Sequence, residues 1–155
     1  MTDQAAALTT AREILDTMLG TLGFFVTIHE ENDERGPGLQ IETEDSAILI
    51  GNKGDRLDDI QYLVNRVLQE KLPDAPRVRV DVGHYREQRE SEMVEKVKAV
   101  ASRVAAGGRP VILNPLNSYH RRIVYGALKE FPEVEATSPQ DRSRMKRITI
   151  RKKQG

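Results

Sequence analysis

Two glycines, Gly51 and Gly54, enclose a polar residue and a cation, Asn52 and Lys53. Glycine lets a backbone pass close to another molecule because it has no Cβ. The unpaired amides at the start of a following helix favour an anion at the same place. The spacing therefore predicts a clamp for a phosphate backbone, with Arg56 beside it. A helix–helix turn without a ligand is the alternative, and a Walker-type loop is excluded because Asp and Arg follow the second glycine.

A second group of residues could also hold phosphate. Arg121 and Tyr125 lie four apart on a predicted helix and so point the same way, and Lys129 continues that stripe. A guanidinium makes forked hydrogen bonds to phosphate, and an aromatic ring can stack a base. Arg122 lies beside the stripe, and Arg147 on a neighbouring strand adds charge to the same surface. The alternative is a solvated helix face with a partly packed tyrosine.

Catalytic chemistry has no comparable signal. The three histidines are scattered without metal-ligand spacing, and there is no cysteine. No serine lies in a nucleophile-elbow context, and no Ser/His/Asp arrangement stands out. We therefore expect a protein that is not an enzyme, with no catalytic residue, no metal and no cofactor.

The net charge of zero over 155 residues conceals a division. Residues 1–83 hold 8 Lys and Arg against 16 Asp and Glu, whereas residues 84–155 hold 16 against 8. Such asymmetry suggests two units, and the basic one is the natural candidate for a polyanion. The alternative is that the two halves attract each other, or that the charge is solvated surface.

The N-terminus has an early aspartate and no long apolar core, so it does not read as a signal peptide. No apolar run approaches the roughly 20 residues of a membrane span. The absence of cysteine fits a reducing compartment. We expect a cytoplasmic protein without membrane insertion.

The positioning elements of residues 1–83 follow from periodicity and turn signals. Helix 55–71 should turn five apolar residues inward: Leu57, Ile60, Val64, Val67 and Leu68. The expected order is helix 8–20, strand 24–29, loop 30–38, strand 39–43, a short helix ending at 50, the glycine turn, helix 55–71 and strand 77–82. This order predicts an α+β fold, a three-stranded sheet with helices on one face.

After Gly83 the pattern starts again. The expected elements are helix 86–106, strand 110–113, a loop 114–118 that ends in a helix cap, helix 119–130, strand 134–138 and strand 145–152. A polar loop, 139–144, joins the last two strands. Residues 84–155 thus read as a small second α/β domain.

The two candidate sites share a family resemblance. Residues 48–65, around the glycine turn, resemble the type II KH domain of the bacterial Jag family, also called KhpB or SpoIIIJ-associated. Residues 110–128 resemble the same family's second domain, which is named for an Arg-x-x-x-His motif and binds single-stranded nucleic acid. The resemblance runs from about residue 8 to residue 152 and implies a KH domain at 1–83 and an Arg-xxx-His-type domain at 84–155.

The chain departs from the family pattern in three respects. Tyr125 stands where the motif has histidine, so any phosphate contact there is neutral. Asp55, Asp58 and Asp59 surround the clamp and weaken phosphate binding nearby, unless they serve only the helix start. We expect no additional N-terminal Jag domain, because the chain has no room for the one that many members carry.

The resemblance implies an RNA-binding protein that takes single-stranded RNA as its partner. It implies a post-transcriptional regulator or RNA chaperone linked to bacterial cell elongation or division, and hence to cell shape. It also implies a heterodimer with a small KH-domain protein. The alternative is a protein–protein adaptor at the membrane insertase or the ribosome, with a vestigial clamp.

Overall fold

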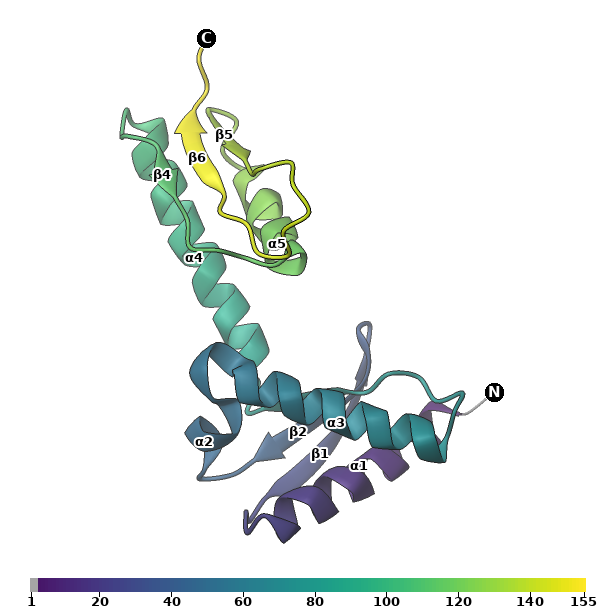
Figure 1. Ribbon diagram of the computed structural model, residues 1–155. Helices are drawn as coiled ribbons and strands as arrows, with labels where there is room; N and C mark the ends of the chain where they lie inside the picture. Colours follow the sequence, from purple (N-terminus) through teal and green to yellow (C-terminus); the bar gives the residue numbers. More distant parts are fainter. Residues whose placement is uncertain (1–2) are drawn as a thin grey trace. The chain divides into compact units, whose positions relative to one another are not determined.

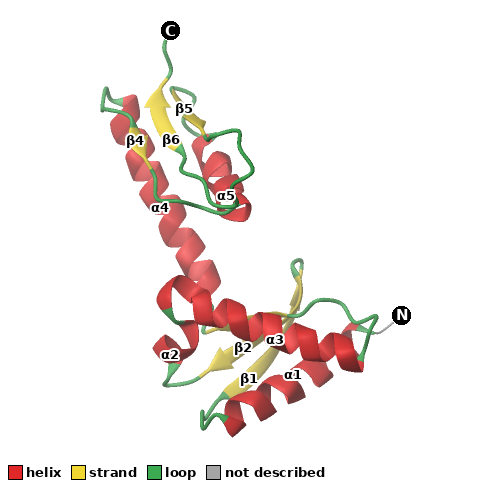
Figure 2. Ribbon diagram, viewed as in Figure 1, coloured by secondary structure: helices red, strands yellow, loops and turns green. Residues whose placement is uncertain are grey.

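The structure, a computed structural model, describes residues 3–155. The chain forms two compact units, one ending at Arg86 and the other beginning at Glu87. This division lies close to the one expected at Gly83. Both units combine helices with a small sheet, so the chain is a mixed α+β protein (Figure 2). None of the helices within residues 3–155 has the length and apolar composition that crossing a membrane requires.

The first unit is a three-stranded sheet with helices on one face (Figure 1). Its sheet order is β1-β2-β3, with β1 and β2 antiparallel and β2 and β3 parallel. A parallel pair needs a crossover, which the two helices after β2 provide. The elements are α1 (Gln4–Thr21), β1 (Thr27–Asp33), β2 (Gly36–Glu42), α2 (Ser46–Ile50), the short helix η1 (Asn52–Gly54), α3 (Asp55–Lys71) and β3 (Arg79–Val82).

The core of the first unit lies between α1, α3 and the sheet. On α3 the buried apolar residues are Leu57, Ile60, Val64 and Leu68, as expected. Val67, expected to face inward as well, is 36% exposed. The buried stripe follows steps of three and four residues, and Val67 falls beside it, next to Leu63 along the helix flank.

Two side-chain amides attach α3 to the edge strand. Asn65 donates through Nδ2 to the Val78 carbonyl at 2.7 Å and accepts from the Val78 amide at 2.8 Å. Gln61 accepts from the Val80 amide at 3.0 Å. These bonds satisfy backbone groups that no further strand pairs. They also hold α3, and the glycine turn that precedes it, at a defined place on the sheet.

The expected loop 30–38 is wrong for most of its length. Strands β1 and β2 pair from Thr27 with Glu42 to Asp33 with Gly36, so only two residues turn. The Asp33 carboxylate accepts from the Arg35 backbone amide at 2.8 Å and from the Arg79 guanidinium at 3.0 Å. The acidic side chains that suggested a loop are therefore carried by an exposed hairpin and partly neutralised there.

The second unit packs two helices against one face of an antiparallel sheet with order β4-β6-β5. Ile148 and Ile150 are fully buried and meet Val97 and Val104 of α4 and Val124 of α5. The last strand begins at Thr149, later than the expected residue 145, because the preceding residues form a loop. The elements are α4 (Tyr85–Ala105), β4 (Val111–Ile112), α5 (Ser118–Leu128), β5 (Val134–Thr137) and β6 (Thr149–Lys152).

Candidate nucleic-acid interface

The glycine turn is held in a backbone conformation that side chains rarely adopt. The φ angles of Gly51, Lys53 and Gly54 are 73°, 54° and 84°. A Cβ at Gly51 would collide with the Asp55 carboxylate and lie 2.8 Å from Arg56 Cβ. Lys53 has no glycine freedom, and a left-handed conformation costs an L-residue about 1–2 kcal/mol. Such strain gathers at functional sites, and here it presents an exposed Lys53 between two glycines.

The expectation of unpaired amides at the start of α3 is wrong for the first two residues. The Asp55 amide donates to the Asn52 carbonyl. The Arg56 amide donates to the Asp55 carboxylate at 2.7 Å. Because a carboxylate already occupies this helix start, anion binding at the turn depends on Asn52 and Lys53 rather than on the helix amides.

Two charged residues near the turn also have structural partners. Arg56 donates through Nη1 to the Ile48 carbonyl at 2.6 Å and so caps the end of α2. Asp58 accepts from Arg86 Nη1 at 2.7 Å. Of the three carboxylates that surround the clamp, Asp55 and Asp58 are thus engaged within the unit, which reduces their repulsion of phosphate.

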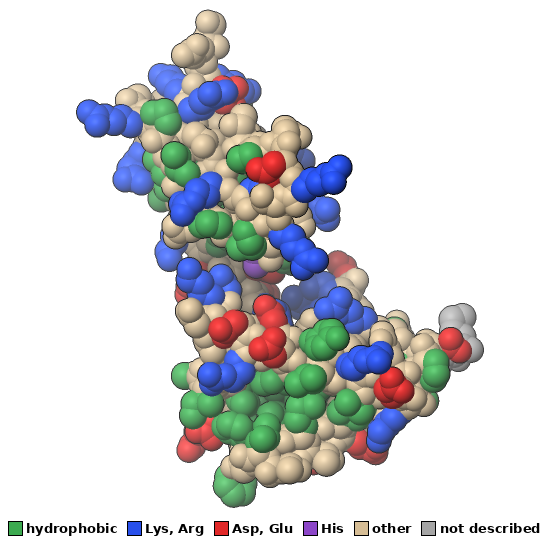
Figure 3. All heavy atoms as spheres, viewed as in Figure 1, with side chains coloured by type: hydrophobic (Ala, Val, Ile, Leu, Met, Phe, Trp, Pro, Cys, Tyr) green, Lys and Arg blue, Asp and Glu red, His purple; other side chains and the backbone are tan. Residues whose placement is uncertain are grey.

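Exposed apolar side chains lie on α2 and along α3, the two helices that flank the turn. Ile48 is 47% exposed, Leu63 is 48% exposed and Val67 is 36% exposed. Figure 3 shows hydrophobic side chains gathered over these two helices. The apolar faces of unstacked bases need such a surface, whereas a phosphate does not. The sequence could have indicated these exposed residues, because α3 carries more apolar residues than its buried stripe needs.

In the second unit, Arg121 and Tyr125 both point to the segment after β5. Arg121 donates through Nη1 to the Leu116 carbonyl at 2.7 Å and to the Arg144 carbonyl at 3.3 Å. The Tyr125 hydroxyl donates to Ser138 Oγ at 2.9 Å. The predicted common face is confirmed, and both of its half-buried side chains bind protein groups there.

The other predicted residues of this unit are exposed. Arg122 and Lys129 lie on or at the end of α5, and Lys129 is its C-cap residue. Arg147 is exposed and lies in the loop before β6, next to the buried Ile148. The structure therefore brings Arg121 and Tyr125 together on α5, while Arg147 lies on the loop before β6.

Residues 139–144 were expected only to join the last two strands, and their position beside α5 was not predicted. The segment runs beside α5 (Figure 1), and Arg142 and Arg144 on it are exposed. Four cations in the stretch Arg-Ser-Arg-Met-Lys-Arg, residues 142–147, were the available signal.

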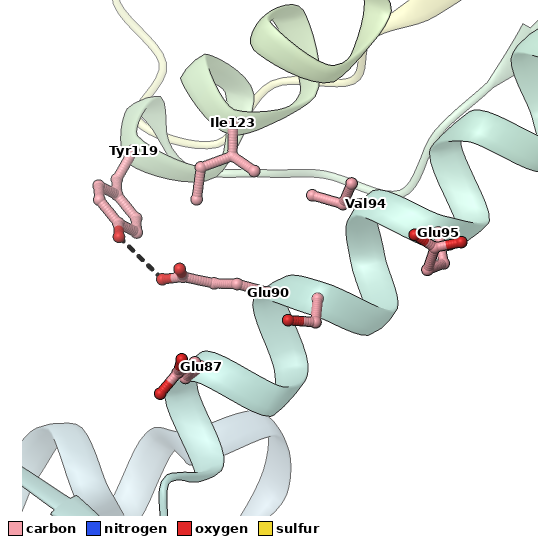
Figure 4. A pocket seen from close by; sticks show the side chains of 7 residues that line it. Glu87, Glu90, Val94, Glu95, Tyr119 and Ile123 are labelled. Carbon is pink, nitrogen blue, oxygen red and sulfur yellow. Dashed lines mark hydrogen bonds between the residues drawn. The ribbon is translucent and has the colours of Figure 1, made fainter.

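A groove of about 350 Å³ lies between α4 and the start of α5. Its apolar lining is Val94 and Ile123, and its polar lining includes the carboxylates of Glu87, Glu90 and Glu95. Tyr119 donates to Glu90 at 2.8 Å, as Figure 4 shows. These carboxylates repel a phosphate, so the groove belongs to no polyanion site. Within residues 3–155 no cluster of three His, Asp or Glu side chains could hold a metal ion.

Comparison with known proteins found no matching family model. Three curated relatives are each named RNA-binding protein KhpB. The relative from Clostridium symbiosum is 35% identical over 121 residues, which is 77% of this chain and 54% of that protein. The relative from Lactiplantibacillus plantarum is 28% identical over 96% of this chain and 48% of its own length. The relative from Streptococcus pneumoniae is 24% identical over 82% of this chain and 39% of its own length.

The chain spans about half the length of the curated relatives it matches. The similarity to the first of them includes most of this chain, and all three share one name. Together with the resemblance of the glycine turn and of the Arg121 helix, this similarity assigns the chain: it belongs to the Jag/KhpB family.

Proposed function

We propose that this chain binds single-stranded RNA and that its first unit acts as a type II KH domain. The observation that carries the proposal is Lys53, which is exposed and left-handed between Gly51 and Gly54. The element order α1-β1-β2-α2-α3-β3, with parallel β2 and β3, supports the KH assignment. The relatives' printed name, RNA-binding protein, supports the ligand class.

The turn and the apolar surface beside it have complementary roles in this proposal. Asn52 and Lys53 contact the phosphate backbone, and the strand's bases lie on the surface formed by Ile48 and Leu63. Arg56 adds positive charge while it caps α2. Binding rests on position and shape, and no residue is assigned a catalytic role.

The second unit contributes a further contact to the same strand. Arg121, Arg122, Tyr125, Lys129 and Arg147 form or border its basic surface, and Figure 3 shows Lys and Arg side chains prominent on the visible face of this unit. Two weak sites on one chain raise the apparent affinity through effective concentration.

The test compares two charge reversals on the first unit. Lys53→Asp removes the turn cation, and Lys71→Asp makes the same charge change at the exposed far end of α3. Binding of a 20-nucleotide single-stranded RNA is followed by fluorescence anisotropy at fixed salt. Lys53→Asp should weaken binding much more than Lys71→Asp. Equal RNA affinities of the two folded variants would contradict the proposal that the glycine turn binds the RNA backbone.

Family membership supports a cellular role beyond binding itself. We infer a cytoplasmic post-transcriptional regulator or RNA chaperone linked to cell elongation or division, and a small KH-domain protein as its partner. Crosslinking and sequencing of bound RNA, mapped back to peptides, tests the first part. Crosslinks at 51–56 and 121–125 are expected.

An adaptor for a basic protein segment is the second candidate function. The groove with Glu87, Glu90 and Glu95 favours it, because carboxylates around an apolar floor suit a basic amphipathic segment. Recovery of a protein partner after nuclease treatment, lost in Glu90→Lys, together with no RNA crosslinks, would favour this function over RNA binding.

A further inference from the structure

We propose that residues 138–147, in the segment between β5 and β6, are a preformed phosphate-binding loop for single-stranded RNA. Arg142 and Arg144 make the phosphate contacts, and Arg121 is a positioning residue that holds the loop. This inference rests on the proposed RNA binding and names contacts in the second unit that family motifs do not supply.

The loop is fixed at several points along its length. Ser138 accepts the Tyr125 hydroxyl at 2.9 Å, and the Arg144 carbonyl accepts from Arg121 at 3.3 Å. Lys146 exchanges both backbone hydrogen bonds with Leu116, at 2.9 and 3.0 Å. A loop that is already ordered loses less conformational entropy when a ligand binds.

Arg121 connects two separate loops through one nitrogen. Its Nη1 donates to the Leu116 carbonyl, before α5, and to the Arg144 carbonyl, after β5. The side chain is half-buried, and this nitrogen already serves two acceptors. Nη1 is thus committed to protein acceptors, and the role that we assign to Arg121 is the position it gives to Arg144 and its neighbours.

The loop carboxylate, Asp141, is exposed and has its partners within the loop itself. Asp141 accepts from the Ser143 amide at 2.9 Å and lies 3.8 Å from Lys146 Nζ. The hydrogen bonds from Ser143, with the charges of Lys146 and Arg121, lower the pKa of the Asp141 carboxyl. Asp141 thus orders the loop and is partly neutralised, which limits its repulsion of phosphate.

The two loop arginines are available to a ligand. Arg142 and Arg144 are exposed, and neither forms an ion pair with any residue between 3 and 155. A single guanidinium group can donate two parallel hydrogen bonds to phosphate oxygens, and it can also stack on a base. Two such groups on a loop that is fixed by hydrogen bonds can therefore contact the phosphates of a single-stranded RNA.

The experiment measures how affinity for a 20-nucleotide single-stranded RNA depends on KCl concentration. The test variant is Arg142→Gln/Arg144→Gln, and the control is Arg103→Gln/Arg109→Gln, which removes two exposed arginines elsewhere in the unit. Each lost phosphate contact reduces the salt slope by about 0.7, so the test variant should lose about 1.4 and bind about tenfold more weakly at physiological salt. The control should keep most of the wild-type slope, because Arg103 and Arg109 add only to the general potential and are assigned no phosphate contact.

A thermodynamic cycle tests the positioning role. Arg121→Gln should speed amide hydrogen exchange at Ser143 and Lys146 and weaken RNA binding in the wild type. In the Arg142→Gln/Arg144→Gln background it should change affinity less than about twofold, because it acts through those residues. An equal loss in both backgrounds would make Arg121 a direct contact and overturn its positioning role.

The outcomes separate this inference from the proposed function. If Lys53→Asp weakens binding while Arg142→Gln/Arg144→Gln behaves as its control does, the loop proposal is wrong and the clamp stands. If wild type shows no salt-dependent binding to the RNA, both fail.

Discussion

The two units use their cations differently. In the first unit Arg12, Arg66, Arg79 and Arg86 form ion pairs with carboxylates of the same unit, at distances from 2.7 to 3.5 Å. In the second unit many exposed cations form no ion pair within residues 3–155: Arg103, Arg109, Arg122, Lys129, Arg142, Arg144, Arg147, Lys152 and Lys153.

This difference suggests that one unit attracts the polyanion and the other positions it. Unpaired surface cations raise the local potential and draw a polyanion over a distance of about a Debye length, roughly 8 Å at physiological salt. In the first unit most of the positive charge is paired with carboxylates of the same unit. Its candidate RNA-binding features are the strained turn and the exposed apolar side chains. We expect the second unit to supply most of the salt-dependent attraction, and the first to position the strand.

The largest expected effect concerns the buried amide of the first unit. Asn65→Leu leaves the Val78 amide and carbonyl without their side-chain partner, which should cost about 3 kcal/mol of unfolding free energy for that unit. Hydrogen exchange of α3 and β3 amides measures the loss. Arg66→Ala, which breaks only an exposed pair with Glu70, is the control and should change little. Similar exchange in both variants would contradict the role of Asn65.

A pair of glycine substitutions tests whether the two units differ in backbone strain. Gly51→Ala forces a Cβ against Arg56 at a φ of 73° and should destabilise the first unit by about 1–3 kcal/mol while reducing RNA affinity. Gly126→Ala on α5 meets no atom within 4 Å and should stabilise the second unit by about 0.5–1 kcal/mol. Urea unfolding followed by residue-specific NMR reads each unit separately. Equal shifts of the same sign would refute the assignment of strain to the turn.

A smaller effect is expected from the hydroxyl link of the second unit. Tyr125→Phe removes the bond to Ser138 and should cost about 1 kcal/mol, less than Asn65→Leu because the link is only partly buried. A double-mutant cycle with Ser138→Ala, measured by thermal unfolding, gives the coupling energy. A coupling near zero would show that Tyr125 does not hold the loop.

The smallest effect concerns pH and the hairpin. The Arg35 side-chain and backbone hydrogen bonds, with the Arg79 charge, lower the pKa of Asp33 to about 2 from 3.8. Because the folded pKa lies below the unfolded value, Asp33 stabilises the hairpin above pH 3.8, and this contribution is lost as the pH falls towards 2. NMR titration of the Asp33 carboxyl carbon checks the midpoint, and a midpoint near 3.8 would mean that the arginine contacts do not form in solution.

Local patterns predicted much of the first unit. Helix α3 was expected at 55–71 and is found at Asp55–Lys71, because an apolar stripe and a proline after it define its limits. The hairpin was misjudged because Gly and Pro in residues 36–38 read as a loop, although Pro37 is paired with Asn32 in the register of the outer strand pair. Val67 was misplaced because a helical stripe does not show which of its edges a neighbouring element leaves open.

The sequence by itself determined the two α+β units, the glycine turn and the shared face of Arg121 and Tyr125, because these depend on spacing and on local backbone preferences. The tertiary structure alone decided what those residues contact. The bonds of Arg56 to Ile48, of Asp58 to Arg86 and of Arg121 to Arg144 join residues 8, 28 and 23 positions apart. No periodic pattern encodes such contacts, since they arise only when packing of the core brings distant segments together.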